Sequence, residues 1–220
     1  ENTMELKGKK INFLGDSITA GSGVMDKANL YWNRIARETG AVTRGYGIGG
    51  TRIARQTKPS GYPVHDQDFI MRVDEMDADA DIIVVFGGTN DFGHGDAKLG
   101  KMSDRTEYTF YGALHVLCEK LINKYPEALI VFMTPLHRLS EDVKVNEIGI
   151  PLETDLEGYV EIEKKVAKYY SIPVLDLFSI SGLQPKVQAL REKFMPDGLH
   201  PNDDGHRIIA DRLVGFLKTL

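Results

Sequence analysis

Three residues near the two ends of this sequence have the side chains that an acyl-transfer reaction requires. Ser17 lies in a Gly-Asp-Ser-Ile-Thr segment, and Asp197 and His200 lie in an Asp-Gly-Leu-His-Pro-Asn segment. A serine hydroxyl can attack a carbonyl carbon, a histidine can take the hydroxyl proton, and an aspartate can hold the imidazole in the required tautomer. Asp197 and His200 are close enough in sequence for one local turn to bring them into contact. The pattern indicates a site for nucleophilic acyl transfer.

Two other segments offer hydrogen-bond donors for the negative charge that develops on the carbonyl oxygen during such an attack. The first is the glycine-rich run from Gly45 to Gly50, where the backbone can approach a ligand closely and present its N–H groups. The second is Gly-Gly-Thr-Asn-Asp at residues 87–91, in which Asn90 supplies a side-chain amide. We expect both segments to lie beside Ser17.

Alternating strand and helix patterns must position these residues. Apolar runs predict strands over residues 10–14, 41–46, 81–86, 129–133 and 173–177. Helical patterns cover residues 30–38, 66–76, 106–124, 153–170 and 205–217. Such alternation favours a parallel sheet with helices on both faces. Ser17, the glycine-rich run and Asn90 then fall at the carboxyl edge of the sheet, where open α/β folds bind ligands.

The composition is that of a soluble globular protein, and it limits the partners. The 220 residues are most simply one domain, residues 1–220, with 42% hydrophobic and 27% charged residues. The net charge is −5 without a block of Lys or Arg, which argues against nucleic acid or an anionic membrane surface as a partner. No apolar run approaches the roughly 18 residues of a membrane span. The single cysteine, Cys118, lies in an apolar helical stretch, where we expect it to fill the core.

The sequence begins at Glu1 rather than with a methionine. This fits removal of a leader, which would make the protein secreted or periplasmic, and it also fits a trimmed chain, which would leave the protein cytoplasmic. The compartment and the oligomeric state therefore stay open.

Taken together, the four segments resemble the four ordered sequence blocks of the GDSL-type (SGNH) hydrolases. The blocks are Gly-Asp-Ser at Ser17, the glycine-rich run that ends at Gly50, Gly-Thr-Asn-Asp at Asn90 and Asp-x-x-His at His200, and the resemblance spans nearly the whole chain. It implies a three-layer α/β/α, flavodoxin-like fold and esterase, lipase, thioesterase or carbohydrate-deacetylating activity. The second block often begins with asparagine, and Gly45 stands there in this sequence. We therefore expect this loop to be braced differently, with unchanged chemistry.

The resemblance also implies a role for each residue of these blocks. Ser17 would be the nucleophile, His200 the base and Asp197 the partner of that base. The backbone N–H groups of Ser17 and Gly50 and the side chain of Asn90 would form the oxyanion hole. No metal and no organic cofactor would take part.

Other motifs point less clearly to a ligand. Residues 45–50 match a dinucleotide fingerprint, but the strand before them is weak and residues 51–59 are a poor helix opening. The His and Asp residues at 65–68 and at 94–96 have metal-binding side chains, but neither group has a third ligand at tight spacing. A helix start and a loop explain these two groups better.

Several single side chains have both a functional and a structural interpretation. Three aromatic residues either stack on a sugar or pack in the core or rim: Trp32, Tyr46 and Tyr62. Three basic residues either meet an anionic substrate or form a solvated face: Arg52, Arg55 and Lys58. We expect Asp16 to accept hydrogen bonds from nearby backbone N–H groups, and His206 to be a surface or packing residue.

These observations predict a serine hydrolase that acts through an acyl-enzyme. Its substrate would be a small molecule that contains a carboxylic ester. A small acyl group on a carbohydrate or another polar alcohol is favoured, because the expected rim of the site, residues 92–103 and 135–151, has no long apolar stretch. A thioesterase or a short-chain lipase is the alternative within this class. A non-catalytic nucleotide-binding or carbohydrate-binding protein on the same fold is the alternative outside it.

Overall fold

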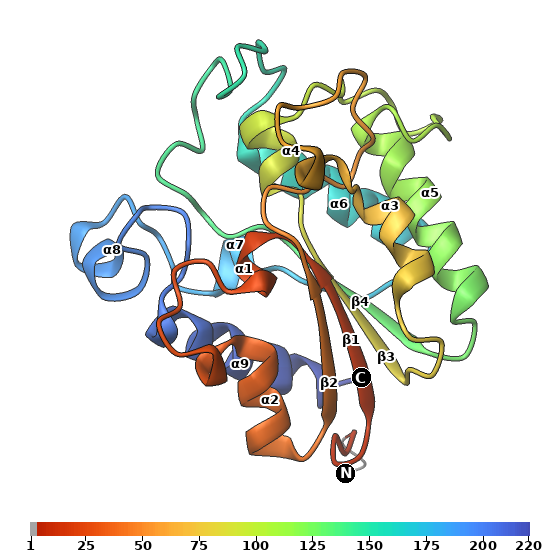
Figure 1. The fold of residues 1–220 in the computed structure, drawn as a ribbon, viewed down its shortest axis with the longest axis vertical. Helices are drawn as coiled ribbons and strands as arrows, with labels where there is room; N and C mark the ends of the chain where they lie inside the picture. Colours follow the sequence, from red (N-terminus) through yellow and green to blue (C-terminus); the bar gives the residue numbers. More distant parts are fainter. Residues whose placement is uncertain (1–3) are drawn as a thin grey trace.

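A central parallel sheet organises residues 4–220, the part of the chain that the computed structural model describes (Figure 1). Its neighbouring strands are all parallel and follow the order β2-β1-β3-β4-β5. The strands are β1 (Lys10–Gly15), β2 (Val42–Gly47), β3 (Ile82–Phe86), β4 (Leu129–Met133) and β5 (Val174–Leu175). The predicted five-stranded α/β fold is confirmed, whereas Glu1 lies outside the described residues.

Helices cover both faces of this sheet. On one face lie α2 (Tyr31–Thr39) and α9 (Asp203–Leu217), and on the other lie α3 (Phe69–Arg72), α5 (Phe110–Lys124) and α6 (Leu156–Tyr169) (Figure 1). The shorter α-helices are α1 (Ser17–Ala20), α4 (Thr89–His94), α7 (Leu177–Ile180) and α8 (Gln188–Phe194). Short 3-10 turns are η1 (Lys27–Asn29), η2 (Pro63–Asp66) and η3 (Val73–Glu75). The sheet and its two helix layers form the predicted α/β/α sandwich.

Strand β3 shows why the sheet has a helix layer on each face. All five of its residues are buried. Ile83 and Val85 pack in the apolar cluster under α3, α5 and α6, whereas Ile82 and Val84 pack in the cluster under α2 and α9. This follows because successive side chains of a strand point to opposite faces. Cys118 is fully buried in the first cluster, as predicted.

Several element boundaries differ from the prediction, and capping residues explain three of the differences. Helix α5 begins at Phe110 because the Thr109 hydroxyl accepts a backbone N–H of its first turn at 3.1 Å. Helix α6 begins at Leu156 because the Asp155 carboxylate does the same, also at 3.1 Å. Strand β5 has only two residues, because Asp176 already caps α7. Among residues 4–220, no helix combines the length and the apolar character needed to cross a membrane.

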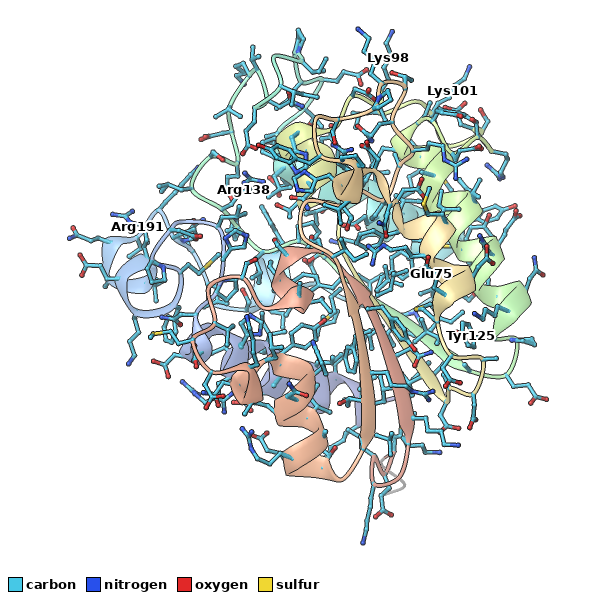
Figure 2. The ribbon with its side chains drawn as sticks, in the orientation of Figure 1. Glu75, Lys98, Lys101, Tyr125, Arg138 and Arg191 are labelled. Atoms are coloured by element: carbon cyan, nitrogen blue, oxygen red, sulfur yellow. The ribbon has the colours of Figure 1, made fainter. Side chains whose placement is uncertain are left out.

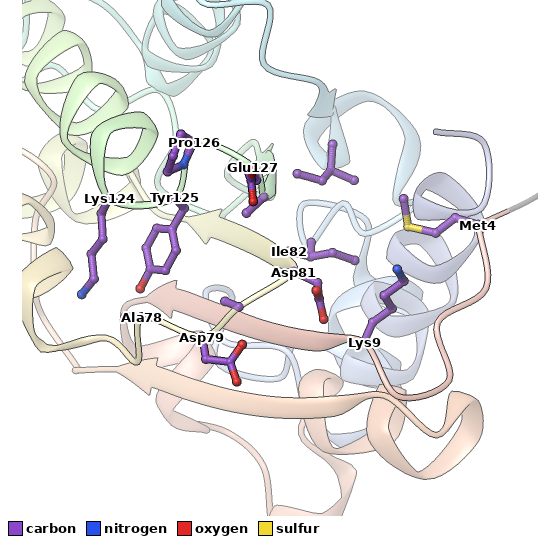
Figure 3. Close-up of a pocket in the computed structure, with 13 residues that line it drawn as sticks. Met4, Lys9, Ala78, Asp79, Asp81, Ile82, Lys124, Tyr125, Pro126 and Glu127 are labelled. Carbon is purple, nitrogen blue, oxygen red and sulfur yellow. The ribbon is translucent and has the colours of Figure 1, made fainter.

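A cavity of about 620 Å³ opens at the amino ends of the strands, the edge opposite to Ser17 (Figure 3). Asp79 and Asp81 belong to its lining. The Asp81 carboxylate accepts the Lys10 backbone N–H at 2.8 Å, and Asp79 forms an ion pair with the Lys10 ammonium. These carboxylates join strand ends, and they lie at the edge of the sheet remote from the candidate catalytic residues.

Candidate active site

Ser17 is presented by a sharp turn from β1 into α1. A Cβ at Gly15 would lie 2.0 Å from Thr19 Oγ1, so only glycine lets the helix fold back this closely. Asp16 is the N-cap of α1, and its carboxylate accepts the Ile18 N–H at 3.0 Å, as expected. Burial raises the pKa of Asp16 to about 6. The turn makes Ser17 the first residue of α1, at the carboxyl edge of the sheet.

Ser17, His200 and Asp197 form one chain of hydrogen bonds. Ser17 Oγ lies 3.0 Å from His200 Nε2, and His200 Nδ1 lies 2.6 Å from Asp197 Oδ2. The other carboxylate oxygen of Asp197 accepts the backbone N–H groups of Leu199 at 2.8 Å and of His200 at 2.6 Å. Burial alone would raise the pKa of Asp197, but these hydrogen bonds outweigh it and lower the pKa. The carboxylate therefore holds the imidazole proton on Nδ1, which leaves Nε2 free to accept the Ser17 proton.

Three N–H groups near Ser17 are free to bind an oxyanion. Within residues 4–220, the backbone N–H groups of Ser17 and Gly50 have no acceptor. A Cβ on Gly49 would lie 3.8 Å from Ser17 Cβ, which places the glycine-rich run against the serine. Asn90 is buried and donates one amide hydrogen to Thr51 O at 3.0 Å, so its second amide hydrogen stays free. The structure thus brings all the predicted site residues to one edge of the sheet.

Glycine is required at two positions of the glycine-rich run. Gly50 has a φ of 75°, and a Cβ there would lie 2.5 Å from His65 Cδ2. A Cβ at Gly45 would lie 2.4 Å from the ring of Trp32, whose Nε1 donates to Thr19 O at 2.9 Å. The indole therefore occupies the space that an asparagine side chain would need. This is the different bracing expected at Gly45.

A buried arginine of α3, which the sequence analysis did not single out, ties the loops of the site together. Arg72 donates to Gly15 O at 2.9 Å, to Tyr46 O at 2.7 Å and to Thr51 Oγ1 at 2.9 Å. These acceptors belong to β1, β2 and the loop after β2. Arg72 therefore fixes the glycine-rich run relative to the strand that carries the serine.

Asp91 braces the same loop from the other side. Its carboxylate accepts the backbone N–H groups of Ile53 at 2.9 Å and of Ala54 at 3.0 Å. Burial raises the pKa of Asp91 to about 7, although these two hydrogen bonds oppose the shift. The fourth residue of the Gly-Thr-Asn-Asp block thus supports the loop rather than the reacting atoms.

Arg138 holds the rim loop, residues 135–151, against two parts of the site. Its guanidinium donates to Thr89 O and to Thr89 Oγ1, both at 3.1 Å, at the start of α4. The next residue, Leu139, donates its N–H to Gly198 O at 2.8 Å, inside the Asp-x-x-His turn. Figure 2 shows Arg138 between the loops above the sheet and the segment that carries α8. The loop therefore borders the site, as predicted, and links two of its blocks.

The start of α9 is fastened to the segment between α1 and α2. Asp203 Oδ2 accepts the Asn29 side-chain amide at 2.8 Å. His206, one turn further on, is fully buried, and its Nδ1 accepts the Tyr31 backbone N–H at 3.0 Å. His206 is therefore a packing residue rather than a surface residue. These contacts, which we call the α9 clamp, hold the Asp-x-x-His turn beside α1.

The other ligand motifs do not form the dinucleotide site or the metal sites that they resemble in sequence. No helix follows the glycine-rich run before η2, so the helix N-terminus on which a dinucleotide fingerprint depends is missing from this stretch. Asp66 and Asp68 instead pair with Arg52 at 2.8 Å and with Arg55 at 3.1 Å. In the part of the chain that the structure describes, no group of three or more His, Cys, Asp or Glu residues is placed to hold a metal ion.

The fold and the residues at the carboxyl edge of its sheet are those of an α/β/α carboxylic ester hydrolase. Sequence comparison supplies the family. The model of the GDSL-like lipase/acylhydrolase family matches residues 13–208, and the chain belongs to this family. A comparison with curated protein sequences gives no match.

Several solved structures share this fold. A protein from Lactobacillus plantarum is 31% identical, with 97% of this chain and 98% of that chain covered and a TM-score of 0.82. A member of the lipolytic G-D-S-L family from Veillonella parvula is 16% identical, with 96% and 99% covered and a TM-score of 0.64. A two-domain esterase active on acetylated mannans is 17% identical and has a TM-score of 0.58; the match covers 97% of this chain and 49% of that chain. The last two likenesses concern the fold alone.

Proposed function

We propose that this protein removes a small acyl group from a carbohydrate or a similar polar alcohol, through an acyl-enzyme formed on Ser17, and that residues 1–220 act as one hydrolase domain. The observation that carries the proposal is the continuous hydrogen-bond chain from Asp197 through His200 to Ser17, with distances of 2.6 and 3.0 Å. Such a chain activates a serine hydroxyl that would otherwise be a weak nucleophile.

In the first half of the reaction, Ser17 Oγ attacks the carbonyl carbon of the ester while its proton moves to His200 Nε2. The carbonyl oxygen becomes an oxyanion, which the N–H groups of Ser17, Gly50 and Asn90 stabilise. When the tetrahedral intermediate collapses, the bond to the alcohol oxygen breaks, and that oxygen takes the proton from His200. Asp197 stabilises the imidazolium that exists between these two proton transfers.

In the second half, a water molecule attacks the acyl carbon that is now bound to Ser17 Oγ. His200 accepts a proton from this water, and the same N–H groups stabilise the second oxyanion. Collapse breaks the bond to Ser17 Oγ, which recovers its proton from His200, and the carboxylic acid leaves. Both halves use the same base and the same donors, so the site needs no rearrangement between them.

Two observations support a neutral, polar substrate. Two of the three basic residues that could have met an anion are paired within the protein, Arg52 with Asp66 and Arg55 with Asp68, whereas the exposed Lys58 forms no ion pair with residues 4–220. The two-domain esterase with the same fold acts on acetylated mannans, which are esters of a small acyl group with a neutral carbohydrate. An acetylated sugar is therefore the substrate class that we propose.

A fluorophosphonate probe tests the mechanism, because it reacts covalently only with an activated serine. The wild-type protein should be labelled at Ser17 and should cleave p-nitrophenyl acetate. Ser17→Ala should lose labelling and retain less than roughly 1% of the activity, since loss of a nucleophile typically costs several orders of magnitude. Ser22→Ala, which changes an exposed serine nearby, is the matched control. Labelling that persists in Ser17→Ala, or activity above that level, would contradict the proposal.

A further inference from the structure

A cavity of about 590 Å³ lies directly beside the glycine-rich run. Its lining includes Arg52, Tyr62, His65, His94, Ile148 and Ile150. The segments that carry these residues rise above the same end of the sheet as α1 (Figure 1). The imidazole of His65 packs against Gly50, since a Cβ at Gly50 would lie 2.5 Å from His65 Cδ2. A group bound in this cavity would therefore sit next to one of the proposed oxyanion donors.

His94, which lines this cavity, has a hydrogen-bond donor whose position in the ring is fixed. Its Nδ1 lies 3.1 Å from Arg52 Nη1, and because a guanidinium can only donate, Nδ1 must accept. Burial and the Arg52 charge lower the pKa of His94 to about 4, so the ring is neutral and its single proton is on Nε2. Within residues 4–220 this Nε2–H has no acceptor. A hydroxyl of a ligand would accept it, whereas an alkyl chain would leave it unsatisfied.

Apart from the charge of the exposed Lys58, the charges around the cavity are balanced within the protein. Arg52 pairs with Asp66 at 2.8 Å. The carboxylate of Asp96, another lining residue, accepts two backbone N–H groups from the segment after Gln56, each at 2.9 Å. The cavity therefore favours a neutral polar ligand over an anion.

Tyr62 gives the cavity an exposed aromatic face. Of the three aromatic residues that the sequence offered for stacking on a sugar, Trp32 packs on Gly45, and the Tyr46 hydroxyl accepts a backbone N–H at 3.0 Å. Tyr62 alone of these three is largely exposed, at 69%. Its ring lies 5.2 Å from that of His65, which joins it to the cavity wall. An aromatic ring with one solvent-exposed face can stack on the apolar C–H face of a sugar.

We infer that this cavity binds a sugar ring of the substrate, stacked on Tyr62, with a hydroxyl that accepts the His94 Nε2–H. The inference rests on the proposed function, because it needs an acylated sugar as the substrate. The ester oxygen must still reach His200 Nε2 to take its proton. The bound ring is therefore the one that carries the acyl group or its neighbour in an oligosaccharide.

Kinetics of Tyr62 variants test this inference with two substrates. Tyr62→Ala removes the stacking face. KM for acetylated manno-oligosaccharides should therefore rise about tenfold relative to KM for p-nitrophenyl acetate, which corresponds to the loss of roughly 1.4 kcal/mol of binding free energy. Tyr62→Phe keeps the ring and should restore the wild-type ratio. Tyr108→Ala, which removes an exposed tyrosine outside the lining, is the matched control. An equal effect of Tyr62→Ala on both substrates would overturn the inference. A loss of activity confined to p-nitrophenyl octanoate would also overturn it, because the cavity would then bind the acyl chain.

Calorimetric titration measures sugar binding without turnover. An acetylated manno-oligosaccharide should bind to the Ser17→Ala variant, and adding Tyr62→Ala should weaken the Kd about tenfold. No binding, or a Kd that Tyr62→Ala leaves unchanged, overturns the inference even where ester hydrolysis by Ser17 is established. If the sugar binds but the wild-type protein does not hydrolyse it, the proposed function fails and the cavity assignment stands.

Discussion

His200 is oriented almost entirely by its own turn. The Asp197 carboxylate accepts hydrogen bonds from Leu199 N, His200 N and His200 Nδ1, all within one four-residue stretch. Ser17 is likewise presented locally, by the cap that Asp16 makes on α1. Each half of the proposed site is thus held by hydrogen bonds within its own segment, and the Ser17–His200 hydrogen bond joins the two halves.

Asn90→Ala tests the oxyanion hole at the residue scale. The free amide hydrogen should bind the developing oxyanion more strongly than the ground-state carbonyl, so its loss should lower kcat with little change in KM. Removal of one such donor costs about 10²–10³ in rate, and we expect the lower end because the Ser17 and Gly50 N–H groups remain. Steady-state kinetics with p-nitrophenyl acetate give both constants, with Asn33→Ala on α2 as the control. A several-fold rise in KM at constant kcat would instead make Asn90 a substrate-binding residue.

Some residues of the site could be predicted from the sequence because their type and their place after a strand carry the chemistry. Ser17 and Asn90 are of this kind, and His200, which lies between α8 and α9, is marked instead by its Asp-x-x-His spacing from Asp197. Arg72 could not be predicted, because its acceptors, such as Gly15 O and Tyr46 O, are mostly backbone carbonyls that every residue possesses. A residue that acts through the backbone leaves no pattern in the sequence.

The rim loop, residues 135–151, is the element that connects the blocks of the site. Arg138 reaches the start of α4, and its neighbour Leu139 reaches the Asp-x-x-His turn. The Arg138 guanidinium is buried and also stands over the Phe92 ring at 5.6 Å. A shift of this loop would therefore move the proposed oxyanion donor and the proposed base relative to each other.

Arg138→Met should separate catalysis from binding, because methionine keeps the apolar stem but not the donors to Thr89. A displacement of reacting groups by about 1 Å can cost roughly 10²-fold in rate, so kcat for p-nitrophenyl acetate should fall by about tenfold or more with KM nearly constant. The rate of fluorophosphonate labelling at Ser17 should fall in parallel. Arg105→Met, at an exposed arginine of another loop, controls for the change of residue type. A lower Tm with unchanged kcat would mean that Arg138 stabilises the fold but does not position the reacting groups.

Elements with strong periodicity could be predicted, and short ones could not. Strand β3 and helix α5 have enough residues for their apolar patterns to be read. Helices α1 and α4, which carry Ser17 and Asn90, have four and six residues, too few for a periodic pattern. Asp16 caps α1, whereas α4 begins after Gly88 without a side-chain cap, and both residue types occur in many turns.

The whole molecule buries three carboxyl groups close to the site. Burial raises the pKa of Asp16 to about 6 and that of Asp91 to about 7. Burial raises the pKa of Glu163 on α6 well above its usual value, and neither of its oxygens has a hydrogen-bond partner among residues 4–220. Glu163 also lies against Gly88, where a Cβ would be 3.1 Å from Oε1. The fold therefore makes all three groups easier to protonate than exposed carboxyl groups are.

Glu163→Gln should stabilise the protein at high pH. Below the unfolded pKa of about 4.3, both the folded and the unfolded state hold the proton, so wild type and variant should have similar Tm values at pH 4. As the pH rises, the unfolded state loses this proton first. The wild-type free energy of unfolding therefore decreases until the pH passes the pKa that Glu163 has in the folded state. At pH 8 the Tm of Glu163→Gln should be higher by about 2–4 °C or more, the shift expected per 1 kcal/mol in a chain of this size.

Thermal melts between pH 4 and pH 8 give this comparison. Glu161→Gln changes a neighbouring carboxylate of α6 that is 61% exposed, and it should leave the pH dependence of Tm unchanged. A parallel pH dependence for wild type and Glu163→Gln would mean that Glu163 is not held protonated in the folded state.

The parallel sheet also explains why the site could be located before its contacts were known. Strands that all run in one direction bring every loop after a strand to the same edge, which is how β1, β2 and β3 deliver Ser17, Gly50 and Asn90. The α9 clamp and the buried Glu163 could not be foreseen in this way. They depend on which helix faces meet, and helix faces are set by the packing of the complete core.

The α9 clamp has a consequence for the order in which the protein becomes active during its synthesis. Ser17 and His200 are 183 residues apart, so a ribosome produces the proposed nucleophile well before the proposed base. If the proposed roles hold, a nascent chain carries a serine without its base until α9 has emerged and docked beside α1, and it has no activity before then. The first turnover of a newly made molecule would then mark the docking of α9.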